Sequence, residues 1–269
     1  MRIVSLNAWG GQLWEEMAAW LPGCGADVLL LQEVTRAPEP APPWMEYRDA
    51  YRRLWQRTDL FADIRALLPG WQAVFAAAAR GPLGSDAATA RRSEHGIAAF
   101  FAPHLAVAGQ VQGFAHGAFR RDGWGPEPVP RPLQAFRVFD PGPERTLTLA
   151  HFHGLRDPGG KGDTPERAVQ AETVARTLQG FAAPGEAMVL AGDFNVLPES
   201  ATFARFAELG LSDLVTAGGI TDTRTSHYAK PVRYADYMLV TQTVPVARFD
   251  APAAPEVSDH RPLVLDVAP

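Results

Sequence analysis

Two oxygen-bearing side chains follow a strongly apolar segment in the second half of the chain. Residues 187–191 read Ala-Met-Val-Leu-Ala, which predicts a buried strand, and Gly192-Asp193-Phe194-Asn195 comes directly after it. Because side chains alternate along an extended chain, Asp193 and Asn195 are expected on one face. Carboxylate and amide oxygens bind hard cations and orient attacking water. Acidic residues also end strands as turn formers, so the motif gains weight only from matching segments elsewhere.

Asn7 and Glu33 occupy similar places in the first half of the chain. Asn7 closes a predicted strand over residues 2–7 and is either a site residue or a turn residue before Gly10-Gly11. Glu33 lies near the end of a predicted strand over residues 27–34 that is otherwise almost entirely apolar. A carboxylate there is costly unless it is paired or bound to a metal. This favours a metal ligand at Glu33 over a structural salt bridge.

His151 and His153 flank Phe152 and are expected to point to one face. A pair with this spacing can bind zinc, but no histidine or cysteine follows closely to complete such a site. The pattern therefore favours a histidine that faces phosphate.

Asp259 and His260 precede the last predicted strand. Adjacent side chains on an extended chain point to opposite sides, so one could face a metal and the other a substrate. A histidine that acts as a base needs a carboxylate to fix its tautomer and support its charge. Asp236, at the start of another apolar segment, is the candidate for this partner, and a structural aspartate is the alternative.

The elements that must position these residues alternate between strands and helices. Apolar runs predict strands over residues 2–7, 27–34, 71–77, 96–101, 105–114, 133–139, 146–152, 188–193, 234–241 and 262–267. Helical spacing predicts helices over residues 12–21, 58–68, 165–181 and 200–209. Thr164 is expected to cap the third helix, with Pro165 at its first position. The order predicts an α/β fold with mixed sheets, and the segments 36–57 and 123–132 are expected to be irregular.

Composition bounds the function classes. The 269 residues carry a net charge of −5 and no polybasic arm, which argues against tight, sequence-blind binding of long duplex DNA. Cys24 is the only cysteine, so an intrachain disulfide is excluded, and a small buried hydrophobe is its expected role. No apolar run approaches the roughly 20 residues of a membrane span. We expect a single domain over residues 1–269, a cytoplasmic location and no membrane anchor; the oligomeric state is open.

The glycine-rich loop 159–164 leads into the predicted helix that starts at Pro165. Its spacing does not match a nucleotide-triphosphate loop, because Lys161 is followed by glycine rather than serine or threonine. A helix N-terminus can attract anions, so Arg156, Lys161 and Arg167 are candidates for gripping substrate phosphate. The alternative is a solvated, flexible connection.

Aromatic residues and arginines mix in the two irregular segments. The aromatic residues are Trp44, Tyr47, Tyr51 and Trp55 in the first segment and Trp124, near Arg120 and Arg121, in the second. Such mixtures can stack bases and neutralise phosphates. They can equally form a small satellite core, which is the expectation for at least half of them.

The ordered motifs resemble those of the endonuclease/exonuclease/phosphatase superfamily, which includes deoxyribonuclease I. The motifs that carry the resemblance are Asn7, Leu31-Gln32-Glu33-Val34, His153, Gly192-Asp193-Phe194-Asn195, Asp236 and Ser258-Asp259-His260. They span nearly the whole chain and are specific for the superfamily, but not for a substrate within it. The resemblance implies a four-layer sandwich, in which two mixed β-sheets pack face to face with helices outside. It also implies Mg²⁺- or Mn²⁺-dependent cleavage of phosphoester bonds.

The resemblance also implies roles for the oxygen-bearing residues. Glu33 is the implied principal metal ligand, and Asn7 and Asp259 complete or support the metal site. Asp193 and Asn195 are implied to orient the attacking water, the phosphate or a second ion.

For the histidines, the resemblance implies that His260, held by Asp236, is the general base or binds phosphoryl oxygens. His153 is implied to stabilise the charge on the phosphorane. Many family members read Asn-Thr-His-Leu where this chain has His151-Phe152-His153-Gly154. His151 therefore replaces an asparagine, which leaves the division of roles between the two histidines open.

Three functions are compatible with these features. The favoured hypothesis is a metal-dependent phosphodiesterase or nuclease that acts on nucleic acid or nucleotides. The alternative is a phosphomonoesterase, or a phosphodiesterase for lipid headgroups or inositol phosphates. A binding protein without catalysis is the third, and it is disfavoured because every catalytic position is filled.

Overall fold

The computed structural model describes residues 1–48, 53–84, 89–125 and 128–269. Tyr51, one of the aromatic residues singled out in the sequence, lies outside the described residues.

In the described part of the chain, the first sheet has six strands in the order β13-β14-β1-β2-β6-β5. β1 and β2 run parallel, and the other neighbouring pairs are antiparallel. The bounds are β1 Arg2–Asn7, β2 Val28–Arg36, β5 Gln72–Leu83, β6 Arg91–Phe101, β13 Val246–Asp250 and β14 Leu263–Val267.

The second sheet, counted over the same residues, has six strands in the order β11-β12-β10-β9-β8-β7. β9 and β10 run parallel, and the remaining neighbours are antiparallel. The bounds are β7 Ala106–His116, β8 Arg131–Asp140, β9 Arg145–Phe152, β10 Ala187–Asp193, β11 Leu211–Asp213 and β12 Asp236–Thr241. Both sheets are therefore mixed, as predicted.

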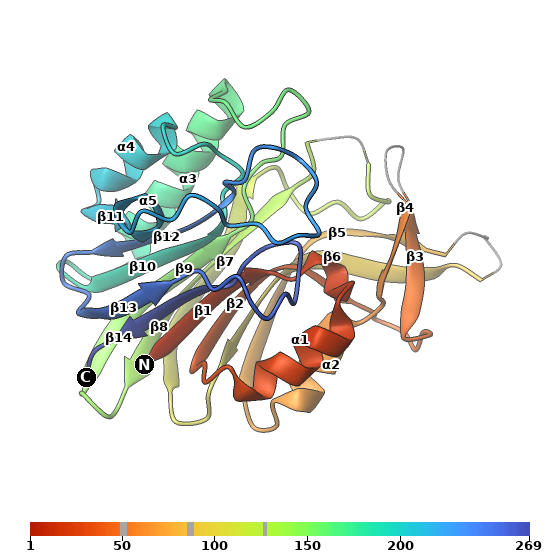
Figure 1. Ribbon diagram of the computed structural model, residues 1–269, viewed down its shortest axis with the longest axis horizontal. Coiled ribbons are helices and arrows are strands. Elements are labelled where there is room, and N and C mark those ends of the chain that lie inside the picture. The colour runs from red at the N-terminus through yellow and green to blue at the C-terminus, as the bar shows by residue number, and fades with distance from the viewer. Residues whose placement is uncertain (49–52, 85–88, 126–127) are drawn as a thin grey trace.

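Helices cover the outer face of each sheet, which gives the predicted four-layer sandwich (Figure 1). α1 and α2 lie outside the first sheet, and α3, α4 and α5 lie outside the second. The bounds are α1 Trp14–Trp20, α2 Leu60–Leu67, α3 Pro165–Phe181, α4 Ala201–Ala207 and α5 Leu214–Ala217. Short 3₁₀ turns, Trp9–Gly11 and Leu21–Gly23, flank α1. No helix among the described residues is both long enough and apolar enough to cross a membrane.

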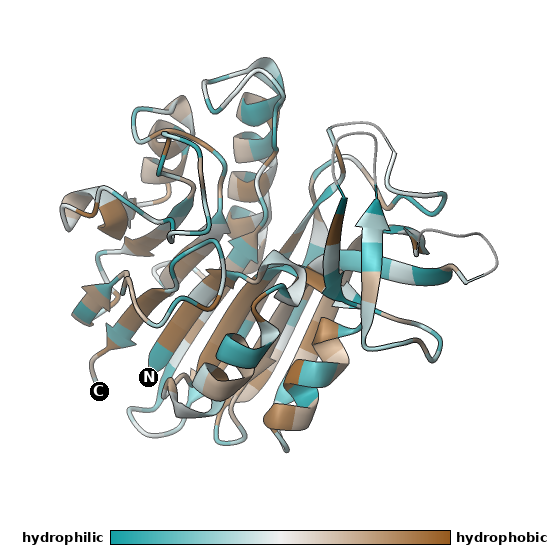
Figure 2. Ribbon diagram, turned by 45° about the vertical axis from the view of Figure 1, so that its right-hand side comes forward, coloured by the Kyte–Doolittle hydropathy of each residue, from teal (hydrophilic) through white to brown (hydrophobic). Residues whose placement is uncertain are grey.

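Alternation along the strands divides the apolar residues between two cores. In β1, Ile3 joins the core between the sheets, whereas Val4 and Leu6 join the core under α1 and α2. β2 divides in the same way, with Leu30 on the inner side and Leu29 on the helix side. Figure 2 shows the resulting hydrophobic colouring along the central strands. Because both faces are covered, these strands are nearly continuous apolar runs.

The expectation of irregular structure over residues 36–57 was wrong for its second half. β3 (Trp44–Arg48) and β4 (Arg53–Arg57) pair as an antiparallel hairpin beside the first sheet (Figure 1). Contacts distant in sequence stabilise it, because Gly84 N donates to Glu46 O at 2.7 Å and Met45 packs with Leu83 and Trp124.

The aromatic residues of this hairpin divide between two environments. Tyr47 packs against Trp124 at a ring-centroid distance of 5.2 Å, as expected for a satellite core. Trp55 is 62% exposed and belongs to none of the cores that the described residues form.

Most predicted elements are present with shifted ends. The expected strands 71–77, 96–101 and 105–114 extend further, because long antiparallel pairings continue past their apolar stretches. The short edge strands β11 and β13 and the four-residue α5 were not predicted. α3 has the predicted bounds, and Thr164 Oγ1 accepts from Arg167 N at 3.3 Å as its cap.

Candidate functional site

The ends of the central strands open into a cleft of about 710 Å³ between the two halves of the sandwich. The predicted site residues that line it are Glu33, His153, Arg156, Lys161, Arg167, Asp193, Asn195, Asp259 and His260. Asn7 and Asp236 lie directly behind this lining, whereas His151 lies deeper between the sheets. The fold therefore gathers residues from opposite ends of the chain.

Asn7 connects the first sheet to the second. Its Nδ2 donates to Asp193 Oδ2 at 3.1 Å, and its Oδ1 accepts from Trp9 N at 3.0 Å. Its main-chain oxygen accepts from Ser258 Oγ at 2.6 Å. These bonds fix the amide beside the cleft and join it to the segment that carries Asp259.

A bulge in β2 directs Glu33 into the cleft. The pairing of β2 with β6 shifts register between Leu31 and Val34, and Glu33 has a φ of 53°. Burial raises the pKa of Glu33, but electrostatic interactions with His153, His95 and His260 outweigh burial and lower it to about 2. Glu33 is therefore an ionised oxygen donor at neutral pH.

The turn after β10 brings Asp193 and Asn195 together by a bend rather than by the alternation expected from the sequence. Gly192 has a φ of 139°, and a Cβ there would lie 2.1 Å from the oxygen of Phe152, so only glycine fits. Asn195, at φ 55°, donates its main-chain N–H to Asp193 Oδ1 at 3.0 Å. Burial raises the pKa of Asp193, but interactions with His260, His153 and the nearby cations outweigh burial, so the pKa is lowered overall.

His260 and Asp236 form a hydrogen-bonded pair. Nδ1 of His260 lies 2.8 Å from both carboxylate oxygens of Asp236, and Thr223 Oγ1 donates to Asp236 Oδ2 at 2.8 Å. Burial lowers the pKa of His260, but Asp236 outweighs it, so the pKa is raised above the usual value. Nε2 of His260 lies 3.7 Å from Asp193 Oδ2 and faces the cleft.

Asp259 and His260 do not point to opposite sides, contrary to the sequence expectation. The backbone bends at Ser258 and Asp259 instead of running extended, so both side chains reach one guanidinium. Nη1 of Arg224 donates to Asp259 Oδ2 at 3.1 Å and also to Nε2 of His260. Arg224 follows no recognisable motif in the sequence, which is why it was not predicted.

His153 has a cation as its partner. Nη1 of Arg131 lies 3.2 Å from Nδ1 of His153. Because a guanidinium only donates, Nδ1 accepts and the ring proton lies on Nε2, which requires that the Asn195 amide, 3.4 Å from Nε2, presents its oxygen there. Nε2 is 3.7 Å from Asp193 Oδ2 and 4.0 Å from Glu33 Oε1. Burial and Arg131 together lower the pKa of His153 to about 3, so it is a neutral N–H donor.

His151 is fully buried behind His153. Its Nε2 lies 2.8 Å from Gln134 Oε1, and its Nδ1 lies 3.3 Å from Gln32 Nε2. Burial lowers its pKa to about 3, so the ring is neutral. The side chain bridges β2 of one sheet and β8 of the other, and it is not among the residues that line the cleft.

Arg167 is engaged by the backbone. It is 1% exposed, and its guanidinium donates to the main-chain oxygens of Leu155, Gly160, Gly162 and Asn195. These bonds hold the loop that precedes α3. Arg167 therefore holds the main chain of this loop in place through hydrogen bonds.

Lys161 projects from the same loop. It donates to Tyr234 O, and burial lowers its pKa. Arg156 also lines the cleft and is half-buried. Lys161 and Arg156 thus remain the candidate phosphate contacts of this loop.

The donor atoms fit a hard divalent cation. Glu33, Asn7 and Asp259 offer oxygen ligands, the type that Mg²⁺ and Mn²⁺ prefer. Asp259 Oδ1 is buried and has no hydrogen-bond partner among the described residues, as expected of an oxygen that would bind a cation. Deeper in the site, ligand atoms of Asp193, Asp236 and His260 lie within 4.8 Å of one another and could also hold a metal.

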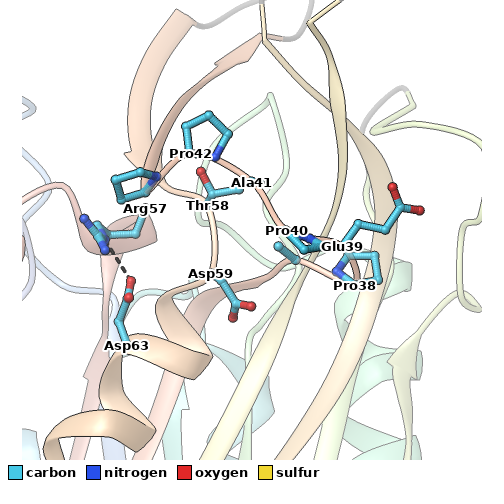
Figure 3. Close-up of a pocket in the computed structure, with 11 residues that line it drawn as sticks. Pro38, Glu39, Pro40, Ala41, Pro42, Arg57, Thr58, Asp59 and Asp63 are labelled. Carbon is cyan, nitrogen blue, oxygen red and sulfur yellow. Dashed lines mark hydrogen bonds and ion pairs between the residues drawn. The ribbon is translucent and has the colours of Figure 1, made fainter.

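A second hollow of about 450 Å³ lies beside the start of α2 (Figure 3). Prolines from the segment 38–43 and the carboxylates of Glu39, Asp59 and Asp63 line it, and Arg57 pairs with Asp63 at 2.8 Å. None of the predicted catalytic residues reaches it.

Comparison with protein families agrees with this geometry. Residues 4–260 match the model of the Endonuclease/Exonuclease/phosphatase family. The chain belongs to this family. Its members' chemistry is phosphoester hydrolysis, so this protein is a phosphoester hydrolase of the family. A search of curated proteins found no match.

Solved structures show the same fold at low sequence identity. A mannosyl-6-phosphatase from Bacteroides thetaiotaomicron is 14% identical with a TM-score of 0.69, covering 100% of this chain and 99% of that one. The human nocturnin catalytic domain with bound sulfate is 19% identical with a TM-score of 0.63, covering 100% and 93%. A humanised D. rerio TDP2 is 14% identical with a TM-score of 0.61, covering 100% and 99%. At these identities the likeness concerns the fold alone.

Proposed function

We propose that this protein is a Mg²⁺- or Mn²⁺-dependent phosphodiesterase that acts on nucleotides or short nucleic acids. One observation supports this most strongly: the Asp236–His260 pair faces Asp193 across 3.7 Å in a cleft that also receives Glu33 and Asp259. This combination joins a base, a water-orienting carboxylate and metal-binding oxygens. Together they are what metal-assisted phosphoester hydrolysis requires.

In the proposed mechanism, the base and its neighbours act on water. His260 takes a proton on Nε2 from a water that Asp193 and Asn195 orient. The water oxygen bonds to phosphorus. The bond between phosphorus and the leaving-group oxygen breaks, and its electron pair stays on the leaving-group oxygen. Asp236 holds the imidazole by Nδ1 and supports the positive charge that His260 gains.

The remaining residues serve the phosphoryl group. Glu33, Asn7 and Asp259 would hold the divalent ion, which polarises a phosphoryl oxygen when bound. His153 would donate its Nε2–H to a phosphoryl oxygen as negative charge builds there. Because Arg131 keeps His153 neutral, this contact requires no proton transfer.

The shape of the cleft supports a small substrate. Its volume lies in the range of small-molecule sites, and the β3–β4 hairpin contributes Tyr47 to its wall. Trp9 and Trp124 line it too, as do Arg156 and Lys161, so a base could stack while its phosphates meet cations. The net charge of −5 argues against long duplexes.

A phosphomonoesterase is the second candidate. Arg224 and Lys161 both act electrostatically on Asp193, so two cations lie near the reacting centre. A dianionic monoester would gain more from two cations than a monoanionic diester.

An activity screen tests the proposal and separates the two candidates. The purified protein is assayed with Mg²⁺ or Mn²⁺ on bis-p-nitrophenyl phosphate, the corresponding monoester, dinucleotides, single- and double-stranded DNA, RNA and inositol phosphates. We expect metal-dependent turnover with diesters above monoesters, and its loss in Asp193→Ala. Faster turnover of the monoester would favour the second candidate, and no metal-dependent hydrolysis at all would reject both.

A further inference from the structure

Arg224 occupies a position beside the reacting centre that its structural bonds do not explain. It is 5% exposed and lines the cleft. A guanidinium has five N–H donors, and among the described residues its Nη1 donates to the side chains of Asp259 and His260. Within the described ranges, Nε is buried with no hydrogen-bond partner. Asp259 already supplies one anionic partner, but a buried guanidinium whose Nε has no acceptor is costly unless a further anion binds it.

Several bonds hold the Arg224 backbone at this place. Its N–H donates to Asp222 Oδ1 at 2.8 Å, and its carbonyl oxygen accepts from Arg233 at 3.1 Å and from Arg261 at 2.9 Å. The guanidinium carbon lies 4.1 Å from the ring centroid of Tyr228, which fixes the plane of the fork. The group is therefore preorganised rather than loosely drawn in by acidic neighbours.

The contact with His260 leads to a specific requirement. Nε2 of a neutral imidazole has one lone pair, and Nη1 of Arg224 occupies it. The same lone pair must accept the proton of the attacking water in the proposed mechanism. A stronger acceptor that attracts the guanidinium would free Nε2 at the moment it is needed. Phosphoryl oxygens are such acceptors and match the planar fork.

We infer that Arg224 is a catalytic residue that binds the phosphoryl group of the substrate and releases Nε2 of His260 as it does so. The inference rests on the proposed function and adds the residue that recognises its charged group. Lys161, which acts electrostatically on the same carboxylate, Asp193, is the neighbouring cation.

Phosphate binding tests the inference without catalysis. Inorganic phosphate is titrated calorimetrically into the metal-loaded wild type, Arg224→Met, Arg224→Lys and Arg248→Met. Arg248 is an exposed cation of β13 that does not line the cleft, so its variant matches the charge change. We expect Arg224→Met to weaken phosphate binding at least tenfold, Arg224→Lys to fall between, and Arg248→Met to change it less than threefold. Equal binding by Arg224→Met and the wild type would overturn the inference.

Chemical rescue adds a readout that a purely structural role would not move. Guanidinium chloride at low millimolar concentration should raise the turnover of Arg224→Ala by tenfold or more, whereas equal sodium chloride should not. Thermal melts show whether each variant is folded at the assay temperature. If Arg224→Ala and Arg224→Met are unfolded there, the comparison of Arg224→Lys with the wild type decides. Absence of rescue in a folded variant counts against the inference. If the wild type hydrolyses no ester but Arg224→Met loses phosphate binding, Arg224 is a phosphate-binding residue, and both its catalytic role and the proposed function fail.

Discussion

Two histidines of one cleft have opposite environments. A carboxylate holds His260 and raises its pKa, whereas burial and a guanidinium lower the pKa of His153. Environments that push two pKa values apart assign different roles to chemically identical groups. His260 thereby suits proton transfer, and His153 suits donation of a fixed N–H.

The first prediction concerns the partner of the base. Asp236 raises the pKa of His260, so wild-type activity should rise with pH along a limb above the usual histidine value of about 6.5. Asp236→Asn should move this limb to lower pH and reduce kcat by about 10²–10⁴-fold. The pH dependence of kcat/KM measures both effects. The exposed carboxylate variant Asp250→Asn should match the wild type, and an unmoved limb in Asp236→Asn would contradict the assignment.

The site was predictable from the sequence where its residues end strands. Asn7, Glu33 and Asp193 each follow an apolar run, and such a signal lies within a few neighbouring residues. Arg131 contacts His153, 22 positions further along the chain, and Arg224 contacts His260, 36 positions further along. No local pattern distinguishes these arginines from surface arginines. Their identification therefore required the fold.

At the scale of elements, the loop before α3 depends on one buried side chain. Arg167 satisfies four main-chain oxygens, including that of Asn195. The loop has no regular structure to pair these groups, so the guanidinium replaces the hydrogen bonds that a ladder would supply.

The second prediction follows from this clamp. Arg167→Met should lower the free energy of unfolding by about 3 kcal/mol or more, because buried carbonyls lose charged donors. Urea titration measures the change. Arg176→Met, on the exposed side of the same helix, should stay within about 0.5 kcal/mol of the wild type. An Arg167→Met protein of full stability but raised KM would instead identify a substrate contact.

Elements with strong local signals were predictable, and those that depend on distant partners were not. The helix Pro165–Phe181 has a capping threonine and a proline at its first position, so its bounds follow from the sequence. The paired strands β3 and β4 follow a proline-rich segment and are stabilised through Leu83 and Trp124, far along the chain. Proline content therefore predicted irregular structure where tertiary packing supports strands.

At the scale of the whole molecule, the acidic cleft makes the fold sensitive to cations. Burial raises the pKa of Asp259, so its ionised form is disfavoured in the protein without metal. A divalent ion that binds only the folded state removes this penalty and stabilises by mass action.

The third prediction is a metal-dependent melting temperature. At 100 times the dissociation constant a single ion adds about 2.7 kcal/mol, which for a chain of this size raises Tm by roughly 5–10 °C. Differential scanning fluorimetry with Mg²⁺, Mn²⁺ and EDTA measures the shift. Glu33→Gln should abolish most of it. A melting curve that millimolar metal leaves unchanged would argue against the ion site.

The fourth prediction is the response to acid. The pKa of Glu33 is about 2 in the folded protein and about 4.3 in an unfolded chain, and the pKa of Asp193 is lowered as well. The stability that these two ionised carboxylates contribute is present above their pKa values in the unfolded chain. It is lost as pH falls through their pKa values in the folded protein. His151 and His153, with folded pKa values of about 3, add a loss that begins near the usual histidine value of about 6.5. We therefore expect the metal-free protein to lose stability as pH falls from about 6.5 to 2, with the carboxylates contributing below about pH 4.5, at about 1.4 kcal/mol per pKa unit.

Denaturant melts at each pH measure this loss, and Glu33→Gln should flatten it. If residues 1–269 form one domain as predicted, each melt should show a single cooperative transition.

The left-handed backbone at Glu33 has a practical consequence for capturing substrate complexes. A glutamate at φ 53° is held against its conformational preference, at a cost on the order of 1 kcal/mol or more. Glycine adopts that conformation freely, so Glu33→Gly would relax the bulge while it removes the carboxylate. Relief of this strain offsets part of the stabilisation that the variant loses with the ionised carboxylate. Glu33→Gly is therefore the silenced form to crystallise with an intact ester.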